Sequence, residues 1–353
     1  MKTNITERSA RPTFGRRSLL RGIGAAGAAS LVLPFASATT AGATTSATSL
    51  TTANDAIFVT GKNSSYYVVP GRDQNGKKAV AYGSHGNWEF VQDNRLPWFE
   101  PEHIAARPND KGHYDLLYMG YLGGNLVSNG GYEFYNKPRL NTGKKSVPLS
   151  SVSSLQYAPG ADYFLAVGKN GAGQDRVIHG DHNSWSFTPN KYQLNGWGAE
   201  MTHFAVREKA NPTNNSHYTM LAVGTRVKKG EPQVVTLGGY EFYNKPRFSV
   251  GPKVVPNMVS VDDVVATPNY YVILGRDANG DSIVAHGGHN DWSFTPGKYQ
   301  PKMDVTSLAL SPRLTGKYDL LAVGTSKKGL STTGGYEFYS KPRFNSGPKT
   351  IKL

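Results

Sequence analysis

Short apolar segments recur along the chain and alternate with glycine-rich or polar turns. One series of mainly apolar segments comprises residues 56–59, 103–106, 154–157, 203–206, 263–266 and 307–310. A proline follows four of these segments within a few residues, and proline ends a strand because it cannot donate a backbone hydrogen bond. A second series begins at Tyr66, Tyr114, Tyr163, Tyr218, Tyr270 and Tyr318, and each segment is predicted to end at a glycine. Both series have the length and residue types of β-strands.

Turn signals follow the second series and predict two further strands. Asp73–Gly76 and Asp277–Gly280 both end in Asn-Gly, which supplies the positive φ angles of a tight hairpin. A third strand is expected after each turn, and the segments around Lys-Pro-Arg or Thr-Pro-Gly-Lys are expected to lead into a fourth. Asp277, Asn279 and Asp281 also have the alternate spacing of a calcium loop, but no glutamate closes it, so a hairpin turn explains the pattern as well.

Two interleaved sequence repeats divide the chain into units. Gly130–Arg139 and Gly238–Arg247 are identical, and Gly334–Arg343 differs only at Ser340. The second repeat has a histidine three residues before a tryptophan and covers residues 83–90, 180–187 and 287–294. Successive copies of the two repeats are 47, 50, 58, 49 and 47 residues apart. The chain therefore contains six units of two alternating types.

Six units of four short strands, with no convincing helix, predict an all-β fold, a six-bladed β-propeller of four-stranded blades. A four-stranded sheet cannot bury both of its faces alone, and a ring of sheets lets each blade cover its neighbours. An open β-solenoid and three sandwiches of about 100 residues remain alternatives. Because the chain starts with an inner strand and ends near an outer one, the ring is expected to close without strand exchange.

The N-terminal residues are expected to be an export signal. Arg16-Arg17 followed by a mildly apolar glycine- and alanine-rich run resembles a twin-arginine signal, which would cover residues 1–43. A membrane anchor is the weaker alternative, because the run contains Pro34 and few large apolar side chains. Residues 44–54 are predicted to be a disordered lead-in and residues 55–353 the propeller. The protein is therefore expected to be secreted by the twin-arginine route.

The amino-acid composition limits the kinds of chemistry and of binding partner that the protein can have. The chain has no cysteine, which excludes disulfides and thiolate chemistry. Without residues 1–43, 33 lysines and arginines stand against 24 aspartates and glutamates, a net charge of +9 instead of +14. This excess suits anionic wall polymers or acidic protein surfaces. No clustered basic tract indicates a nucleic-acid partner, and no cofactor or metal site is predicted.

The repeats supply two candidate binding surfaces. The histidine–tryptophan repeat could form three sugar sites with the indole against a pyranose ring, or it could pack between blades while the histidine fixes a turn. Its residues are His85, Trp88, His182, Trp185, His289 and Trp292. In the other repeat, strand alternation is expected to place Tyr132 and Phe134 on one face and Glu133 and Tyr135 on the other, with an exposed turn at Pro138. This repeat could form a threefold tyrosine–arginine interface, or it could be a strand and turn preserved by duplication. Its candidate residues are Tyr132, Arg139, Tyr240, Arg247, Tyr336 and Arg343.

Two resemblances carry further expectations. Tyr270–Val284, followed by Trp292, resembles a kelch blade. The combination of a twin-arginine leader, a cysteine-free mature chain and the repeated GGYEFY(N/S)KPR segment resembles secreted bacterial β-propellers of the dispase autolysis-inducing type. That resemblance implies a non-enzymatic extracellular protein that promotes autolysis of a neutral metalloprotease and is cross-linked by transglutaminase. It also implies seven blades, whereas the repeats count six.

The residues permit the transglutaminase role at four glutamines. Gln74 and Gln174 lie in equivalent predicted turns and should both be exposed, whereas Gln193 and Gln300 follow matching Lys-Tyr pairs in another set of loops. No common hydrolase or metalloprotease motif occurs in the chain. A binding protein is therefore the main prediction. The alternatives are a cell-wall glycan lectin and a propeller glycosidase or lyase whose carboxylates converge from different blades.

Overall fold

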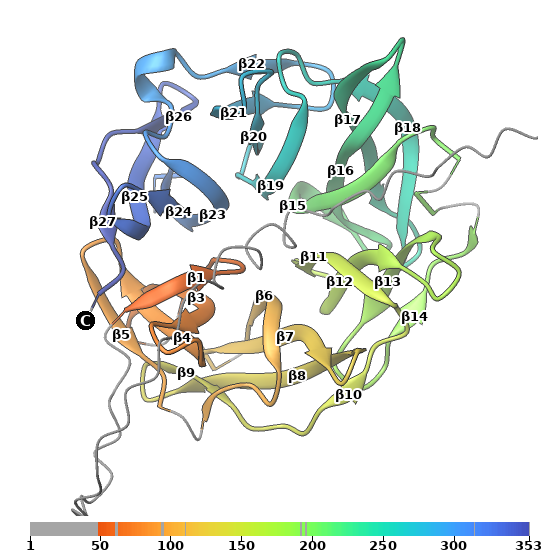
Figure 1. The fold of residues 1–353 in the computed structure, drawn as a ribbon. Helices are drawn as coiled ribbons and strands as arrows, with labels where there is room; N and C mark the ends of the chain where they lie inside the picture. Colours follow the sequence, from red (N-terminus) through yellow and green to blue (C-terminus); the bar gives the residue numbers. More distant parts are fainter. Residues whose placement is uncertain are drawn as a thin grey trace, which may run out of the picture. The chain divides into compact units, whose positions relative to one another are not determined.

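The six units predicted from the repeats form six antiparallel sheets. The computed structural model describes residues 49–60, 63–92, 95–109, 111–190, 193–194, 196–313 and 315–352. Successive sheets, here called blades I to VI, use consecutive stretches of the chain (Figure 1). The predicted signal, residues 1–43, lies outside the described residues.

The strands of blades I to III follow one another from the inner to the outer edge of each sheet. Blade I comprises β1 (Leu50–Ala53), β2 (Ile57–Thr60), β3 (Ser65–Asp73), β4 (Lys78–Ser84) and β5 (Asn87–Phe90). Blade II comprises β6 (Glu100–Pro108), β7 (Tyr114–Leu122), β8 (Asn125–Phe134), β9 (Lys137–Leu140) and β10 (Lys145–Ser146). Blade III comprises β11 (Ser151–Ala158), β12 (Tyr163–Lys169), β13 (Asp175–Gly180) and β14 (Ser186–Phe187).

Blades IV to VI repeat this order. Blade IV comprises β15 (Glu200–Thr213), β16 (Ser216–Lys228), β17 (Glu231–Glu241) and β18 (Pro246–Val254). Blade V comprises β19 (Ser260–Ala266), β20 (Tyr271–Arg276), β21 (Ser282–Gly287) and β22 (Trp292–Phe294). Blade VI comprises β23 (Asp304–Pro312), β24 (Tyr318–Ser326), β25 (Gly329–Phe338), β26 (Lys341–Phe344) and β27 (Lys349–Thr350), and a single 3-10 turn, η4 (Gly297–Tyr299), precedes it.

The innermost strands close into a ring. Contacts run from β2 to β6, β11, β15, β19 and β23, and from β23 back to β2 (Figure 1). The molecule is therefore a six-bladed β-propeller, as the repeats predicted. The seven blades implied by the family resemblance, the open solenoid and the three separate sandwiches are all wrong for this chain.

Strand alternation lets each blade bury both faces. Along β3, Tyr66 and Val68 pack against blade II, whereas Tyr67 and Val69 pack against blade VI. Successive side chains of a strand point to opposite faces, so a run of apolar residues serves two interfaces at once. The same arrangement at every blade produces six apolar clusters, and each cluster lies between two neighbouring blades.

The glycine of each second strand faces a bulge in the inner strand. A Cβ atom on Gly168 would lie 1.8 Å from the backbone oxygen of Ser151, so no side chain fits there. The equivalent glycines of the other blades meet the same obstacle, at 1.8 to 2.1 Å. The prediction that the second strand ends at this glycine is wrong, because β12 and its counterparts continue past it. The glycine instead permits the bulge, which re-aims the next inner-strand side chain.

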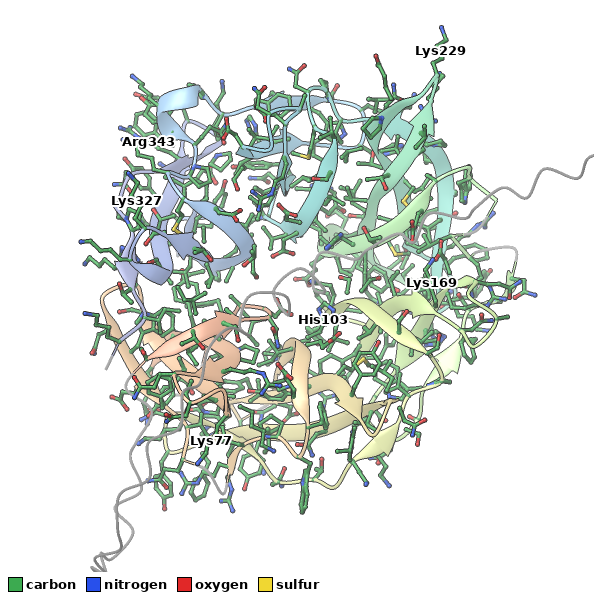
Figure 2. All side chains as sticks on the ribbon, in the orientation of Figure 1. Lys77, His103, Lys169, Lys229, Lys327 and Arg343 are labelled. Atoms are coloured by element: carbon green, nitrogen blue, oxygen red, sulfur yellow. The ribbon has the colours of Figure 1, made fainter. Side chains whose placement is uncertain are left out.

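A polar belt surrounds the propeller axis at this bulge. The equivalent residues of blades I to VI are Asp55, His103, Ser154, His203, Asp263 and Ser307. Side chains of the odd blades accept hydrogen bonds from the inner-strand backbone of the following even blade. The backbone N–H of Ile104 donates to Asp55 Oδ2 (3.1 Å), that of Phe204 to Ser154 Oγ (3.4 Å) and that of Leu308 to Asp263 Oδ2 (2.7 Å). Figure 2 shows His103 beside the axis.

The belt also brings two carboxylates together. Ser307 Oγ donates to Asp263 Oδ2 (3.1 Å) and lies 3.5 Å from Asp55 Oδ1. His103 Nδ1 lies 3.5 Å from the other oxygen of Asp55. Burial, followed by the nearby charge of Asp55, raises the pKa of Asp263 to about 7.

The two ends of the described chain meet without exchanging a strand. Ser49 forms a single antiparallel bridge with Lys352, and Ile351 is buried in the cluster between blades I and VI. The prediction of a disordered lead-in through residue 54 is therefore wrong for residues 49–54, since they form the bridge and β1. No helix in the described part of the chain is long and apolar enough to cross a membrane.

We expect Asp263→Ser to change the pH dependence of stability. Serine already occupies this position in blades III and VI and can accept the same backbone hydrogen bond. Because the pKa of Asp263 is raised in the folded state, its favourable contribution is present at low pH and is lost as the pH rises through about 7. The melting temperature of the wild type should therefore fall relative to the variant between about pH 4 and 7, by roughly 2–4 °C. If the melting temperatures of the two proteins changed in parallel with pH across that range, the raised pKa of Asp263 would be contradicted.

Candidate functional site

The hairpins between the third and fourth strands of blades II, IV and VI carry the GGYEFY(N/S)KPR repeat. They comprise residues 132–139, 240–247 and 336–343 and are called the tyrosine hairpins below. Each turns through two residues with positive φ, Tyr135-Asn136 (51° and 58°), Tyr243-Asn244 (50° and 59°) and Tyr339-Ser340 (49° and 58°). Positive φ at both central residues defines a type I′ turn, for which Asn-Gly is the usual sequence.

A tyrosine at the first position of such a turn is unexpected for two reasons, its positive φ and the exposure of its ring. A bulky residue with positive φ is a conformational outlier that costs on the order of 1–3 kcal/mol. The three rings are nevertheless 81%, 64% and 84% exposed at Tyr135, Tyr243 and Tyr339. Their side chains therefore gain little burial in return for the strain. Strained backbone and exposed aromatic rings both occur preferentially at binding sites.

Each exposed ring stands at the end of a row of aromatic side chains. In blade II, Tyr132 and Phe134 are 6.3 Å apart between ring centroids, and Phe134 and Tyr135 are 4.5 Å apart, both edge to face. The other two hairpins have the same geometry within 0.1 Å. The row holds the outermost ring in a fixed orientation.

An arginine of the fourth strand covers each row. The guanidinium carbon of Arg139 lies 4.4 Å from the ring centroid of Phe134 and 6.0 Å from that of Tyr132. Arg247 lies 4.8 Å from Phe242, and Arg343 lies 4.6 Å from Phe338. Arg343, on β26, also lies 4.2 Å from the ring of Tyr299 (Figure 2). The structure thus brings together the predicted tyrosine–arginine pairs.

Behind each hairpin, two tyrosines join the even blade to the odd blade before it. Tyr163 and Tyr218 are hydrogen-bonded through their hydroxyl oxygens (2.8 Å), as are Tyr66 with Tyr114 and Tyr270 with Tyr318. Burial raises the pKa of these hydroxyls well above its usual range, so they remain neutral donors and acceptors. The hairpins are therefore built on a neutral hydrogen-bonded junction.

The glutamate of each repeat is directed toward this junction. Glu241 Oε2 accepts hydrogen bonds from the backbone N–H of His217 (2.6 Å) and from its ring Nδ1 (2.7 Å). Glu133 lies 3.3 Å from His113 Nδ1, and both glutamate side chains are almost fully buried. Lys317 replaces the histidine in blade VI, where burial raises the pKa of Glu337 and Lys317 opposes that shift. These carboxylates belong to the support of the hairpin.

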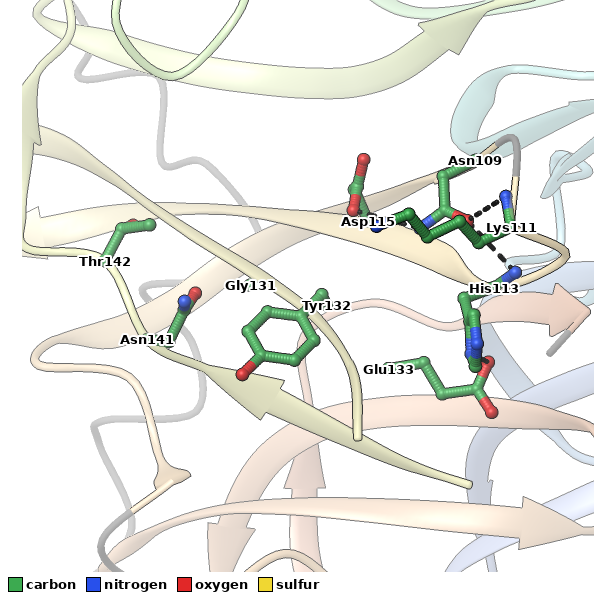
Figure 3. A pocket seen from close by; sticks show the side chains of 9 residues that line it. All are labelled: Asn109, Lys111, His113, Asp115, Gly131, Tyr132, Glu133, Asn141 and Thr142. Atoms are coloured by element: carbon green, nitrogen blue, oxygen red, sulfur yellow. Dashed lines mark hydrogen bonds and ion pairs between the residues drawn. The ribbon is translucent and has the colours of Figure 1, made fainter. Parts of the chain in front are cut away.

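An open pocket of about 480 Å³ lies beside the hairpin of blade II. Its lining includes Tyr132 and Glu133 of the hairpin and Lys111, His113 and Asp115 of the neighbouring strand and loop, with Glu133 beside His113 (Figure 3). Asn109 Oδ1 accepts hydrogen bonds from the backbone N–H groups of residues 111 and 113, both 3.1 Å, and so shapes the loop. The pocket can accommodate a ligand unit next to the aromatic row.

The structure places the histidine–tryptophan repeat at the other type of blade junction. Each histidine reaches the third strand of the preceding even blade: His182 Nδ1 lies 2.9 Å from Ser128 Oγ and His289 Nδ1 2.9 Å from Thr236 Oγ1. His85 Nδ1 lies 2.7 Å from Thr332 Oγ1. Burial lowers the pKa of all three histidines. Trp88, Trp185 and Trp292 pack into the apolar clusters at the same junctions.

The four candidate glutamines fall into two groups. Gln74 and Gln174 are exposed in equivalent hairpins, as expected. Gln193 is 2% exposed, accepts a hydrogen bond from the backbone N–H of Val177 (2.7 Å) and donates to Thr188. Gln300 makes the matching bonds to Val284 and Thr295. Gln193 and Gln300 therefore link the third strand of their blades to the residue that follows the fourth strand. Their carboxamides are engaged in these bonds and are not accessible as a transglutaminase substrate requires.

Sequence reasoning missed the exposed tyrosines at the hairpin tips. Tyr135 was expected to share a strand face with Glu133, but it occupies the turn itself. The expected turn at Pro138 is wrong, because residues 137–140 form β9. A signal was present, since both central turn residues are identical in two copies and Asn136 favours positive φ. The turn was not predicted because Tyr135, which precedes Asn136, is a residue type that favours strands.

Comparisons with known proteins show the fold. No protein-family model and no curated protein sequence matches the chain. Its structure is similar to that of AofleA from Arthrobotrys oligospora, with a TM-score of 0.56 and 14% identity over 87% of this chain and 90% of that one. It is also similar to the fucose-recognising six-bladed lectin of Aleuria aurantia, with a TM-score of 0.53 and 11% identity over 87% and 96% of the two chains. At such identities the similarity establishes the propeller architecture.

Tyr135→Gly should leave the protein at least as stable as the wild type. Glycine adopts positive φ without strain, which offsets the loss of the ring contact with Phe134. We expect the free energy of unfolding to rise or to stay within about 1 kcal/mol. Denaturant titration measures this, with Tyr132→Gly as the control, because Tyr132 lies within β8 and its replacement should cost at least about 2 kcal/mol. A loss at Tyr135 as large as at Tyr132 would show that the exposed ring is structural.

Proposed function

We propose that the chain is a non-enzymatic carbohydrate-binding protein, a lectin, with three equivalent sites at the tyrosine hairpins. The observation that carries the proposal is the exposure of three tyrosine rings on strained turns, each backed by an aromatic row and a stacked arginine. A rigid aromatic side chain offers a flat apolar face to a sugar ring and a hydroxyl for hydrogen bonding, at little cost in conformational entropy.

The composition of the surface favours binding over bond cleavage. The exposed groups are aromatic rings and cations, whereas Glu133 and Glu241 are buried against histidines and do not face one another across an open cleft. The structural neighbours support the same class, since one of them is described as a fucose-recognising lectin. Secretion by the twin-arginine route remains part of the proposal, because a lectin of this kind would meet wall or extracellular glycans.

A glycan array tests the proposal. The wild type should bind a subset of immobilised glycans, and the triple variant Tyr135→Gly/Tyr243→Gly/Tyr339→Gly should lose that binding by at least about tenfold. Val227→Gly serves as the control, because Val227 is also exposed but lies on the hairpin between the second and third strands of blade IV. Undiminished binding by the triple variant would exclude the tyrosine hairpins.

The histidine–tryptophan repeat stays an alternative location for the sugar sites. The double variant Trp185→Phe/Trp292→Phe retains an aromatic ring at each position but removes the indole N–H groups, which have no partner among the described residues. If the sites are at the tyrosine hairpins, this variant should bind the same glycans as the wild type on the array. Loss of glycan binding in a folded Trp→Phe variant would move the sites to the histidine junctions.

The transglutaminase partner remains a second proposal, favoured by the exposure of Gln74 and Gln174. Incubation with transglutaminase and a fluorescent amine should label these two residues and leave Gln193 and Gln300, whose carboxamides bond the backbone of the third strand, unlabelled, as peptide mapping would show. Labelling of Gln193 in the folded protein would contradict this. The predicted neutral metalloprotease partner is tested separately by measuring the lifetime of the protease with and without the mature protein.

A further inference from the structure

Every tyrosine hairpin is surrounded by cations. Besides the stacked arginine, each repeat contributes a lysine two residues before it, and neighbouring strands and loops add further basic side chains over the rings. These groups are Arg95, Lys137 and Arg139 at blade II, Lys209, Lys245 and Arg247 at blade IV, and Lys298, Arg313, Lys341 and Arg343 at blade VI. At least two basic side chains thus lie over the rings of each aromatic row.

The nearby carboxylates are already committed to other partners. Glu133 and Glu241 face His113 and His217, and Asp115 accepts a hydrogen bond from Arg107 (2.9 Å). Asp319 is bonded to Arg313, which lies over the ring of Tyr336. None of these carboxylates is paired with the guanidinium group of Arg139 or Arg343.

Two stacked arginines retain their hydrogen-bonding capacity. Within the part of the chain that the structure describes, Arg139 and Arg343 have ring contacts but no hydrogen bond or ion pair with a side chain. Nε of Arg343 is buried without a partner. Stacking fixes the plane of the guanidinium and leaves its N–H groups free at the edge, the geometry that a carboxylate or phosphate can bind in bidentate fashion.

We propose that the tyrosine hairpins recognise acidic glycans, with the stacked arginine binding an anionic group of the sugar beside the exposed tyrosine. The inference rests on the proposed lectin function and names the class of its ligand. Three copies around one ring match a polymer with repeated charges, because contacts at several hairpins raise the overall affinity without new interactions at any one of them. The anionic group is a carboxylate in a polyuronate or a phosphate in a wall polymer.

Retention on three immobilised polymers tests the inference. These are polygalacturonate, poly(glycerol phosphate) and neutral dextran, all at about 150 mM salt so that distant surface charges are screened. The wild type should bind one or both anionic polymers at least about tenfold more tightly than dextran. Arg139→Lys/Arg247→Lys/Arg343→Lys should lose at least about tenfold of that affinity, because lysine keeps the charge but not the planar bidentate geometry.

A second triple variant provides a control for charge. Lys77→Ala/Lys229→Ala/Lys327→Ala removes three positive charges from hairpins between second and third strands, at the opposite ends of those strands (Figure 2). It should change retention by less than about threefold. If both triple variants lost the same affinity for the anionic polymers, binding would depend only on the net positive charge, and the inference would be overturned. Melting curves establish that each variant is folded, and Arg343→Lys alone replaces the triple variant if that is unstable.

The outcomes separate the inference from the lectin proposal. Binding to dextran or to neutral array glycans that the arginine variant retains in full would overturn the acidic ligand while leaving three lectin sites in place. Absence of binding to every glycan and polymer would overturn the lectin proposal itself. Preference for polygalacturonate over poly(glycerol phosphate), or the reverse, identifies the anionic group.

Discussion

Two apolar faces on every blade are the constraint on which the rest of the structure depends. A single strand such as β3 directs alternate side chains into two different clusters, so neither face of blade I can be left in water. Burial of one Val or Leu side chain contributes about 1.5–3 kcal/mol, and six inter-blade clusters repeat that gain around the ring. The cysteine-free chain has no disulfide to replace it. Closure between Ser49, Ile351 and Lys352 covers the last pair of faces without an exchanged strand.

The ring has pseudo-threefold character because two kinds of junction alternate. From each odd blade to the next even blade, a tyrosine pair is accompanied by a cation–carboxylate pair at the other end of the strands. Arg72 pairs with Glu100, Lys169 with Glu200 and Arg276 with Asp304. From each even blade to the next odd blade, a histidine reaches a serine or threonine hydroxyl instead. The structural repeat is therefore a pair of blades, and the molecule presents three tyrosine hairpins.

The sequence was most informative where local pattern and long-range packing agree. The spacing of the repeats predicted six blades, and the tyrosine-initiated segments correspond to the second strands, because both follow from strand length and alternation. The role of Gly168 could not be predicted, since it depends on the position of Ser151 in the paired strand. The contact of Asp55 with Ser307 likewise requires the closed ring, because 252 residues separate them. The burial of Gln193 depends on the backbone of Val177, which lies one strand away.

The candidate site was predicted in part. Repetition identified Tyr132 and Arg139, and the strand period correctly placed Tyr132 beside Phe134. The conformation of Tyr135 could not be read from propensity, because a tyrosine rarely adopts positive φ and the turn type is decided by the register of β8 and β9. The exposed rings at the hairpin tips were therefore the part of the candidate site that local rules did not predict.

The number of ligand molecules bound per chain tests the account most directly. Isothermal titration of the protein with a short oligosaccharide, too small to bridge two hairpins, should give three equivalent sites, and each single Tyr→Gly variant should remove one of them. A stoichiometry of one would place binding on the axis or at one specialised blade. A stoichiometry of six would mean that odd and even blades bind alike, which contradicts a site built on the tyrosine hairpins.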